Sequence, residues 1–209
     1  YRTQSRGGRG SRGAKTRESD FVEHLFTGNT HSYLLFFTQQ GRCFWLKVYE
    51  IPEASKSSAG RAIQNIIAIP PDDKVKAYIM RLTNGRNEVF LANKSGNAIH
   101  FKESAVRAMG RTAAGVRGIT LDEDRPDDAV VGMVCVDPED KNTTILVVSE
   151  KGNGKRSEVD DYRLTNRGGK GVKTMQVTKK TGDVIAINAV RDDDDLMITT
   201  KSGIIIRMP

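Results

Sequence analysis

The chain has 209 residues, with 33 Lys or Arg against 26 Asp or Glu, a formal net charge of +7 and a pI near 9.5. This length predicts one large or two small folded domains. Two cysteines 92 positions apart, Cys43 and Cys135, exclude a disulfide scaffold and disfavour a zinc module, so both are expected to be buried free thiols. No apolar run approaches the ~20 residues of a membrane span and no signal peptide opens the chain, which predicts a cytoplasmic protein without membrane contact.

Taken in chain order, the predicted elements recur four times. Each unit contains an apolar strand, a short polar turn with glycine and a second strand, which is the pattern of a β-hairpin. The turn glycines are spaced by 55, 56 and 51 residues and are expected to adopt a positive φ. The predicted hairpins are Leu34–Lys47, Val89–Lys102, Ile145–Ser157 and Met197–Met208, with turn glycines Gly41, Gly96, Gly152 and Gly203.

Two further landmarks keep the same period. An aspartate precedes another apolar strand in every unit, at spacings of 53, 55 and 55: Asp20 before 21–26, Asp73 before 75–80, Asp128 before 130–136 and Asp183 before 184–190. A short motif of glycine within two residues of Arg or Lys, which we term the Gly-basic loop, recurs at spacings of 50, 55 and 56, counted from Gly10, Gly60, Gly115 and Gly171. Three landmarks in phase predict a repeat protein with units of approximately 1–57, 58–111, 112–166 and 167–209.

The repeat predicts an all-β, propeller-like fold. Four short antiparallel strands per unit of about 50 residues match the size of a propeller blade, and blades must stack to bury both faces. The WD40 signature is absent. The last unit stops at Pro209, just after its hairpin, so we expect one domain, 1–209, that is incomplete.

The sequence offers no catalytic, metal or cofactor site. The three histidines, His24, His31 and His100, do not recur between units. The segment 8–16 resembles a phosphate-binding loop, but Ala14 separates the glycine from the lysine that this motif requires. The acidic run 192–195 lacks the spacing of a calcium loop. We therefore expect a chain that has no enzymatic activity on its own.

The positive charge is concentrated at the start of the chain. The first twenty residues carry a balance of +4 and are rich in glycine. Clustered Arg in a protein with a pI above 9 indicates a nucleic-acid partner, although charge alone leaves an inert basic tail open. A period of about 55 residues would place the other basic loops along a curved rim, which suits duplex DNA. The low aromatic content, 6%, disfavours stacking on single-stranded bases.

The segment Gln4–Gly10, QSRGGRG, resembles the seven-residue box in the C-terminal domain of the bacterial DNA gyrase A protein. The resemblance continues through 29–31, 47–54, 101–110, 115–119 and 152–156 and so covers essentially the whole chain. It implies a β-pinwheel, a propeller variant in which blades exchange strands. It also implies that the chain wraps duplex DNA around a basic rim with positive handedness. That wrap would let the type II topoisomerase, an isomerase, introduce negative supercoils.

The resemblance also implies partners and contact residues. The partners are duplex DNA, the remainder of the gyrase A protein and the gyrase B protein in an A2B2 assembly, with ATP and Mg²⁺ used elsewhere in that assembly. The segment 166–171, NRGGKG, is a degenerate copy of the box. The predicted DNA-binding residues are Gln4, Arg6, Gly7, Gly8, Arg9, Gly10, Arg12, Lys15, Arg42, Lys47, Arg61, Lys94, Lys102, Arg107, Arg117, Lys155, Arg156, Arg167, Lys170 and Lys173.

Two departures from the family pattern are visible. Ser5 stands where a basic residue is usual, which removes one phosphate contact from the box. The family domain usually has six blades, whereas four units are found here, and a repeat is expected to be missing near Met80 and Arg81. Either the pinwheel is naturally shorter or a segment is absent from the sequence.

Two alternative functions remain open. The corresponding protein of the related topoisomerase IV also has a DNA-binding pinwheel, but that domain is expected to lack an intact box. A protein-interaction propeller with a basic rim would instead bind acidic partners and show no preference for DNA over other polyanions.

Overall fold

The computed structural model describes residues 6–8, 10, 16, 21–22, 25–55, 58–83, 85–106, 114–200 and 202–209, with the backbone alone along 75–82. In these ranges the chain forms thirteen strands and four short 3-10 turns. Every predicted hairpin is present: β1 (Tyr33–Thr38) with β2 (Arg42–Lys47), β4 (Glu88–Asn93) with β5 (Asn97–Lys102), β8 (Thr144–Ser149) with β9 (Gly154–Glu158), and β12 (Leu196–Thr199) with β13 (Ile205–Met208).

The turn glycines of the four hairpins have the predicted positive φ, with values of 81°, 88°, 76° and 86° in chain order. Only glycine reaches this region without a steric penalty from Cβ. A 3-10 turn follows the second strand of the first three hairpins: η1 (Val48–Glu50), η3 (Glu103–Ala105) and η4 (Val159–Asp161). A further turn, η2 (Ile63–Asn65), lies in the connection before β3 (Val75–Thr83).

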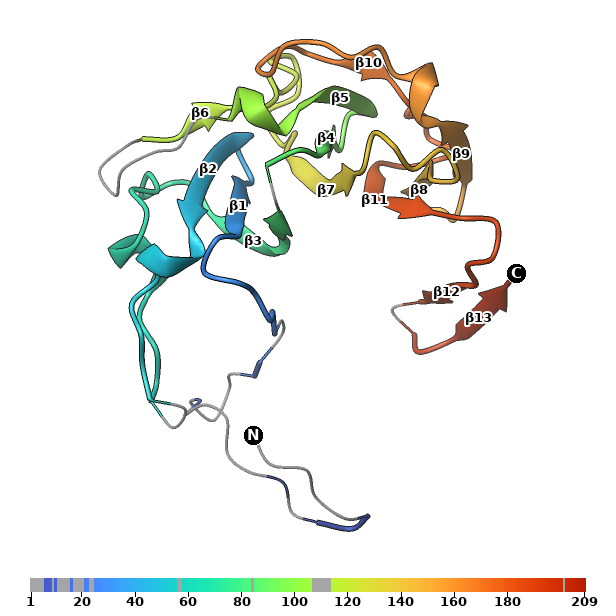
Figure 1. Ribbon diagram of the computed structural model, residues 1–209. Coiled ribbons are helices and arrows are strands. Elements are labelled where there is room, and N and C mark those ends of the chain that lie inside the picture. The colour runs from blue at the N-terminus through green and yellow to red at the C-terminus, as the bar shows by residue number, and fades with distance from the viewer. Residues whose placement is uncertain are drawn as a thin grey trace.

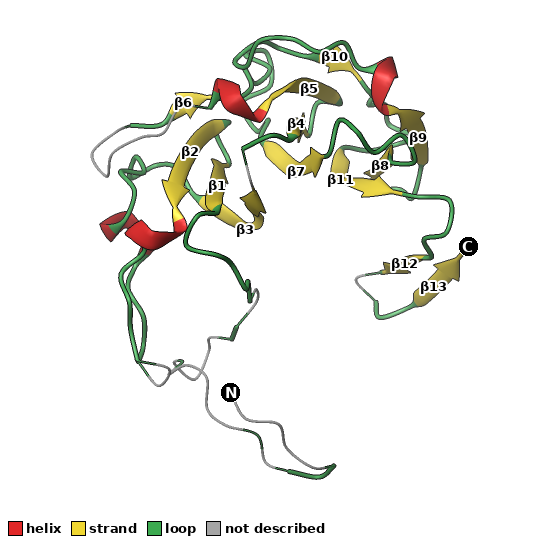
Figure 2. Cartoon of the chain, in the orientation of Figure 1, coloured by secondary structure: helices red, strands yellow, loops and turns green. Residues whose placement is uncertain are grey.

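The sheets combine strands from different repeats (Figure 2). The first sheet has the order β3-β1-β2-β6, so its hairpin comes from the first repeat, β3 from the second and β6 (Val116–Arg117) from the third. The second sheet, β10-β5-β4-β7, repeats this arrangement with β7 (Val130–Val136) and β10 (Val172–Lys173). The third contains β11 (Val184–Val190), β8 and β9, and the fourth is the β12–β13 hairpin. This confirms the pinwheel prediction that blades exchange strands.

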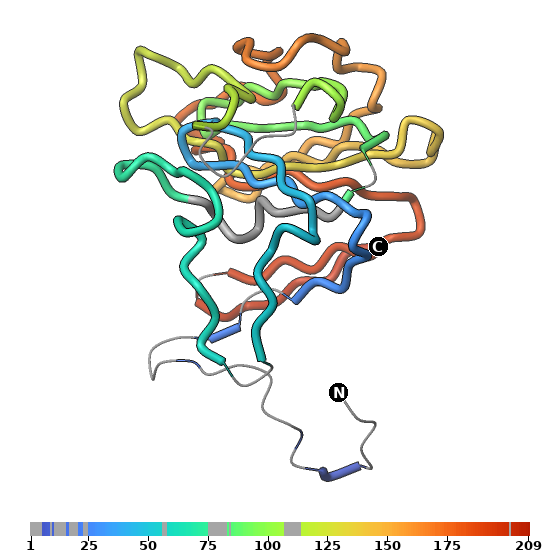
Figure 3. The backbone as a smooth tube through the Cα atoms, turned by 60° about the vertical axis from the view of Figure 1, so that its left-hand side comes forward, coloured from blue at the N-terminus to red at the C-terminus, as the bar shows by residue number. Residues whose placement is uncertain are grey.

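The blades follow one another along an arc (Figure 1). Strands β3, β7 and β11 lie on the inner side, where β7 contacts both β3 and β11, and β6 and β10 lie on the outer side. Seen from another side, the β12–β13 hairpin lies below the other three sheets (Figure 3). Because the short exchanged strands are outermost, the outer edge of each complete blade is formed by a Gly-basic loop.

The core lies between neighbouring blades. Alternate residues of β4 point to opposite faces: Val89 and Leu91 pack toward the first sheet, and Phe90 and Ala92 toward the third. All four side chains are completely buried. A buried Val, Leu or Phe contributes about 1.5–3 kcal/mol through removal of apolar surface from water. Burial on both faces explains why this strand is continuously apolar.

The periodic aspartates hold one repeat to the next. Asp73 Oδ1 accepts a hydrogen bond from the backbone N–H of Gln40, in the preceding hairpin turn, at 3.1 Å. Asp128 Oδ1 does the same for Ser95 at 3.0 Å. Asp183 differs, because its carboxylate pairs with Arg125. Hydrogen bonds to Asp127 and then to Asp183 raise the pKa of Arg125 above its ordinary value.

Of the predicted strand 21–26, the described residues Phe21, Val22, Leu25 and Phe26 lie outside any strand and are exposed, contrary to the prediction, and residues 23 and 24 lie outside the described ranges. In later repeats this strand pairs with the hairpin of the preceding repeat, as β3 does with β1.

The two thiols are free, as expected, but only one is buried. Burial raises the pKa of the Cys43 thiol well above its ordinary value. Cys135 is partly exposed, contrary to the expectation, although it packs against the core cluster that contains Met133. Among the described residues there is no helix of the length and apolar character that a bilayer span requires.

Candidate nucleic-acid interface

The outer strands carry the Gly-basic loops to the edge of the fold. Val116 pairs with Cys43, and Arg117 lies opposite Arg42. One blade further, Val172 pairs with Ala98 and Lys173 with Asn97. The third landmark of the sequence therefore marks the strand that each repeat adds to the outside of an earlier blade.

Glycine is required where the second loop enters its sheet. Gly171 has a φ of 75°, and a Cβ at this position would lie 2.3 Å from the carbonyl oxygen of Ala98. No side chain fits at that distance, so the loop backbone lies directly on the edge of β5. This close approach also leaves the neighbouring Lys170 and Lys173 on the exposed outer surface.

The loops of neighbouring blades are joined to each other. Gly168 donates its backbone N–H to the Gly118 carbonyl at 2.6 Å, and Thr120 donates its own to the Gly169 carbonyl at 2.9 Å. The Thr120 hydroxyl also donates to the Gly168 carbonyl, at 2.7 Å. The segment 166–171 therefore packs on 115–120, and the basic edges of two blades become continuous.

Two of the predicted DNA-binding arginines also hold this edge together. Arg167 donates through Nε to the Ala105 carbonyl at 2.8 Å and through Nη1 to that of Arg117 at 3.1 Å. Arg42 donates through Nη1 to the Ala114 carbonyl at 2.8 Å. A guanidinium has five N–H donors, so each keeps its charge and further donors for a ligand. Both side chains are half-buried.

The structure gathers five predicted contacts on this surface, which we term the outer rim: Arg42, Arg117, Arg167, Lys170 and Lys173. Lys102, at the end of β5, is exposed beside it. Arg61 and Lys155 are exposed elsewhere, and Lys47 is half-buried with its ammonium 5.4 Å from the Tyr49 ring centroid.

Two other predicted contacts are partly neutralised by acids. Arg156 donates to the Thr144 hydroxyl at 2.5 Å and forms an ion pair of 2.6 Å with Asp192. Lys94 lies in the β4–β5 turn near Asp127, whose pKa is lowered first by a hydrogen bond from Arg125 and also by the charge of Lys94. These side chains are less available to phosphate than those of the outer rim.

The box and its degenerate copy share backbone geometry at their glycines. Gly7 and Gly168 have φ values of 83° and 87°, and Gly10 and Gly171 have 71° and 75°. Arg6, Gly7, Gly8 and Gly10 are all exposed. The remaining predicted contacts, Gln4, Arg9, Arg12, Lys15 and Arg107, lie outside the described residues.

The charge reverses at the third blade, which sequence reasoning missed. Lys47, Lys102 and Glu158 occupy equivalent positions, each opposite the first residue of its hairpin. Beside Glu158 is a hollow of about 350 Å³. Its acidic lining consists of Glu88, Asp137, Asp140, Glu158, Asp160 and Asp161. The sequence carried one signal of this reversal, because lysine in the first two hairpins changes to glutamate at the equivalent position of the third. The rim therefore has a basic part and an acidic end.

The acidic hollow is not matched by a metal site. No group of three or more His, Cys, Asp or Glu side chains in the described part of the chain is arranged to hold a metal ion. The candidate site is a surface of exposed and half-buried cations on a hydrogen-bonded edge, an arrangement suited to holding phosphates.

A protein-family model, the DNA gyrase C-terminal domain, beta-propeller, matches residues 1–29, 32–77, 87–137, 143–191 and 194–209. The DNA gyrase A protein of Staphylococcus epidermidis (strain ATCC 12228) is 37% identical over 258 residues that cover 100% of this chain and 28% of the relative. The protein of the same description from Staphylococcus aureus (strain NCTC 8325) is 38% identical and covered to 29%. The chain thus spans less than a third of these relatives.

Two solved structures have the same fold. The structure of a DNA gyrase A C-terminal domain has a TM-score of 0.70 and 26% identity, covering 86% of this chain and 56% of that one. The Escherichia coli ParC C-terminal domain has a TM-score of 0.72 and 18% identity, covering 94% and 77%, and supports the fold alone.

Proposed function

The chain belongs to the family of DNA gyrase C-terminal domains, and from this premise we propose that it binds duplex DNA along the outer rim and wraps it. The match is with this domain and extends over the chain, so the chain corresponds to a DNA-binding part of a type II topoisomerase rather than to its catalytic region. The wrap would present a second DNA segment for passage by the complete enzyme.

The observation that carries the proposal is the repeated geometry of the Gly-basic loops. The copy of the box lies on the edge of β5 and joins the loop of the neighbouring blade. The box has the same positive-φ glycines as this copy. A loop that exposes backbone and cations at each blade holds phosphates along an arc without reading bases.

The assembly around this domain is part of the proposal. We infer that it acts with the remainder of the gyrase A protein and with the gyrase B protein in an A2B2 enzyme in the cytoplasm. ATP and Mg²⁺ would serve other parts of that enzyme, and this chain would hold no cofactor. The whole enzyme would introduce negative supercoils, with the present domain supplying a wrap of positive handedness.

A topoisomerase IV type of domain is the second candidate, since the ParC C-terminal domain has the same fold. The Gln4–Gly10 segment favours the gyrase type, because it matches the box and shares the glycine φ values of its copy. A protein-interaction propeller is the third. Competition by heparin distinguishes this third candidate from the two DNA-binding types, since a rim that wraps DNA prefers duplex DNA to a polyanion of another shape.

The first experiment measures binding of the chain to a duplex as a function of salt. If the rim and box neutralise about eight phosphates, the slope of log affinity against log salt is about −7. A slope close to zero would contradict DNA binding by this surface.

The second experiment separates wrapping from simple binding. Arg6→Ala with Arg9→Ala is expected to reduce the linking-number shift after ligation of nicked circles more than it reduces affinity. Arg191→Ala with Arg207→Ala is the matched control, because it removes the same charge from side chains paired with Asp140 and Asp195. A double box variant that wraps like the control would refute the role of the box.

A further inference from the structure

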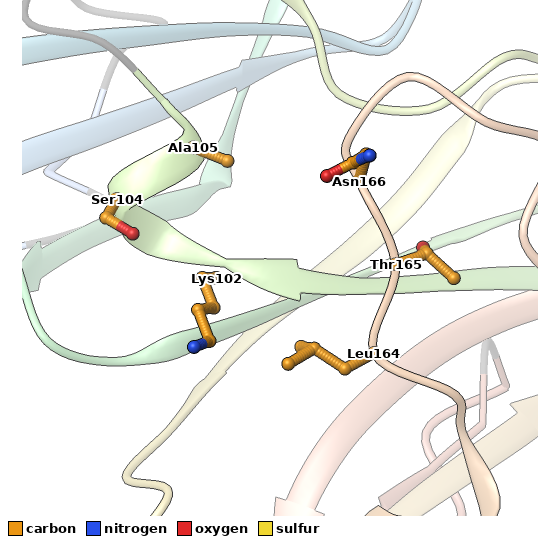
Figure 4. A pocket seen from close by; sticks show the side chains of 6 residues that line it. All are labelled: Lys102, Ser104, Ala105, Leu164, Thr165 and Asn166. Carbon is orange, nitrogen blue, oxygen red and sulfur yellow. The ribbon is translucent and has the colours of Figure 1, made fainter.

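A hollow of about 450 Å³ lies beside the outer rim, between the end of β5 with η3 and the segment 164–166 (Figure 4). Lys102 and Leu164 lie at one end, and Ala105 and Asn166 face each other at the other. Ser104 and Thr165 complete the lining. The two walls come from different repeats, so strand exchange creates this hollow.

Hydrogen bonds hold the two walls at a fixed separation. His100 forms a bridge with Leu164, and its carbonyl accepts hydrogen bonds from the Thr165 N–H at 2.8 Å and hydroxyl at 3.1 Å. Arg167 binds the Ala105 carbonyl at 2.8 Å on the opposite wall. The two walls of the hollow are therefore held together by hydrogen bonds between neighbouring repeats, and exposed side chains line the space between them.

Three polar groups in the hollow are available to a ligand. The side chains of Lys102, Ser104 and Asn166 line it and form no hydrogen bond or ion pair with any residue that the structure describes. They offer an ammonium, a hydroxyl and an amide, all of which donate to phosphate oxygens. Leu164 adds an apolar surface and is 42% exposed.

We propose that this hollow is a seat for one phosphate of the DNA backbone, with the adjoining deoxyribose against Leu164. The proposal rests on the proposed DNA-binding function and adds Ser104, Leu164 and Asn166 to the contacts predicted from sequence. An apolar wall beside hydrogen-bond donors matches a sugar-phosphate backbone, because the deoxyribose can pack against it. A free phosphate ion has no apolar surface to make that contact.

The charge at this position differs between the second and third blades. At the equivalent position of the third blade, Glu158 replaces Lys102, and the adjacent hollow is acidic. A backbone phosphate that binds Lys102 would therefore be repelled by Glu158 at the corresponding strand position of the third blade.

The test uses uncharged and charge-matched substitutions in the whole chain, with a 40-base-pair duplex as the probe. Ser104→Ala with Asn166→Ala removes two donors and no charge, so we expect a loss of affinity of roughly 3- to 10-fold per donor with an unchanged salt slope. Lys102→Ala is expected to reduce the slope by about 0.9. Asn65→Ala with Asn142→Ala is the control, because both side chains are exposed and distant from the hollow in sequence.

A second pair of variants introduces the same charge at two places. Asn166→Asp is expected to weaken duplex binding at least tenfold more than Asn142→Asp, because the new carboxylate would face the bound phosphate. Inorganic phosphate at equal ionic strength is expected to compete no better than chloride, and efficient competition by it would overturn the sugar-phosphate assignment.

The outcomes distinguish the seat from the general function. A wild-type salt slope near zero refutes DNA binding itself. A steep wild-type slope with Ser104 and Asn166 variants that bind like their controls overturns the seat and leaves the proposed function standing. Thermal unfolding midpoints equal to the controls show that any loss of affinity is local.

Discussion

Replacing Gly171 by alanine tests whether the Gly-basic loop lies directly on the edge of β5. Alanine in the left-handed region costs about 1–2 kcal/mol, partly offset by the lower entropy of its unfolded chain. The added Cβ would also lie 2.3 Å from the Ala98 carbonyl oxygen, which forces the strand pair β5–β10 apart. Each hydrogen bond lost between β5 and β10 adds about 0.5–1.5 kcal/mol to this cost. We expect a total loss of about 3 kcal/mol in the free energy of unfolding.

Two control glycines separate the contributions. Gly152 has a φ of 76° but open space around its Cβ position, so Gly152→Ala measures the backbone cost alone, about 1 kcal/mol. Gly169 lacks a positive φ, and its Cβ would make an ordinary 3.7 Å contact with Ile99, so Gly169→Ala is expected to be nearly neutral. Urea denaturation followed by circular dichroism gives all three values. Equal losses for Gly171→Ala and Gly152→Ala would refute the close packing of the loop on β5.

Two further predictions concern buried carboxylates. Asp128→Ala is expected to cost about 3 kcal/mol by urea denaturation, because the carboxylate accepts hydrogen bonds from the N–H of Ser95 and four other donors. The exposed Asp127→Ala should cost much less, and similar losses for the two variants would contradict this. Burial raises the pKa of Glu103, so its protonated form stabilises the fold at acid pH and this contribution is lost as pH rises above the ordinary value of 4.5. The free energy of unfolding of Glu103→Gln relative to wild type should therefore increase between about pH 4 and pH 7, and a difference independent of pH would refute a raised pKa.

Much of the local structure was predictable because it depends on short segments. The turn glycines needed only their neighbours in sequence, and their positive φ followed from the two-strand pattern around them. The periodic aspartates were also visible in the sequence. Their role was not, because Asp128 acts on a turn that lies 33 residues earlier in the chain.

The predictions that failed, and the features that were missed, depend on contacts between segments that are distant in the sequence. The segment 21–26 has the apolar pattern of a strand, yet its described residues lie in no strand, because strand formation depends on pairing with a distant segment, as β3 pairs with β1, and not on the local pattern alone. Ser104 belongs to no basic motif and Asn166 opens the copy of the box, and the two line one hollow only because β10 joins the sheet of an earlier repeat. The acidic end of the rim required the register that places Glu158 at the position of Lys102.

The sequence by itself determined the period and type of the repeats, the hairpins and their glycines, the basic character of the loops and the family to which the box belongs. These properties depend on residue type and on distances of a few residues along the chain. Only the tertiary structure decided which hairpin each Gly-basic loop joins, which cations gather on the outer rim and where the charge reverses. The physical reason is that each sheet takes strands from up to three repeats, so its edge and its hollows are formed by residues whose proximity no local pattern encodes.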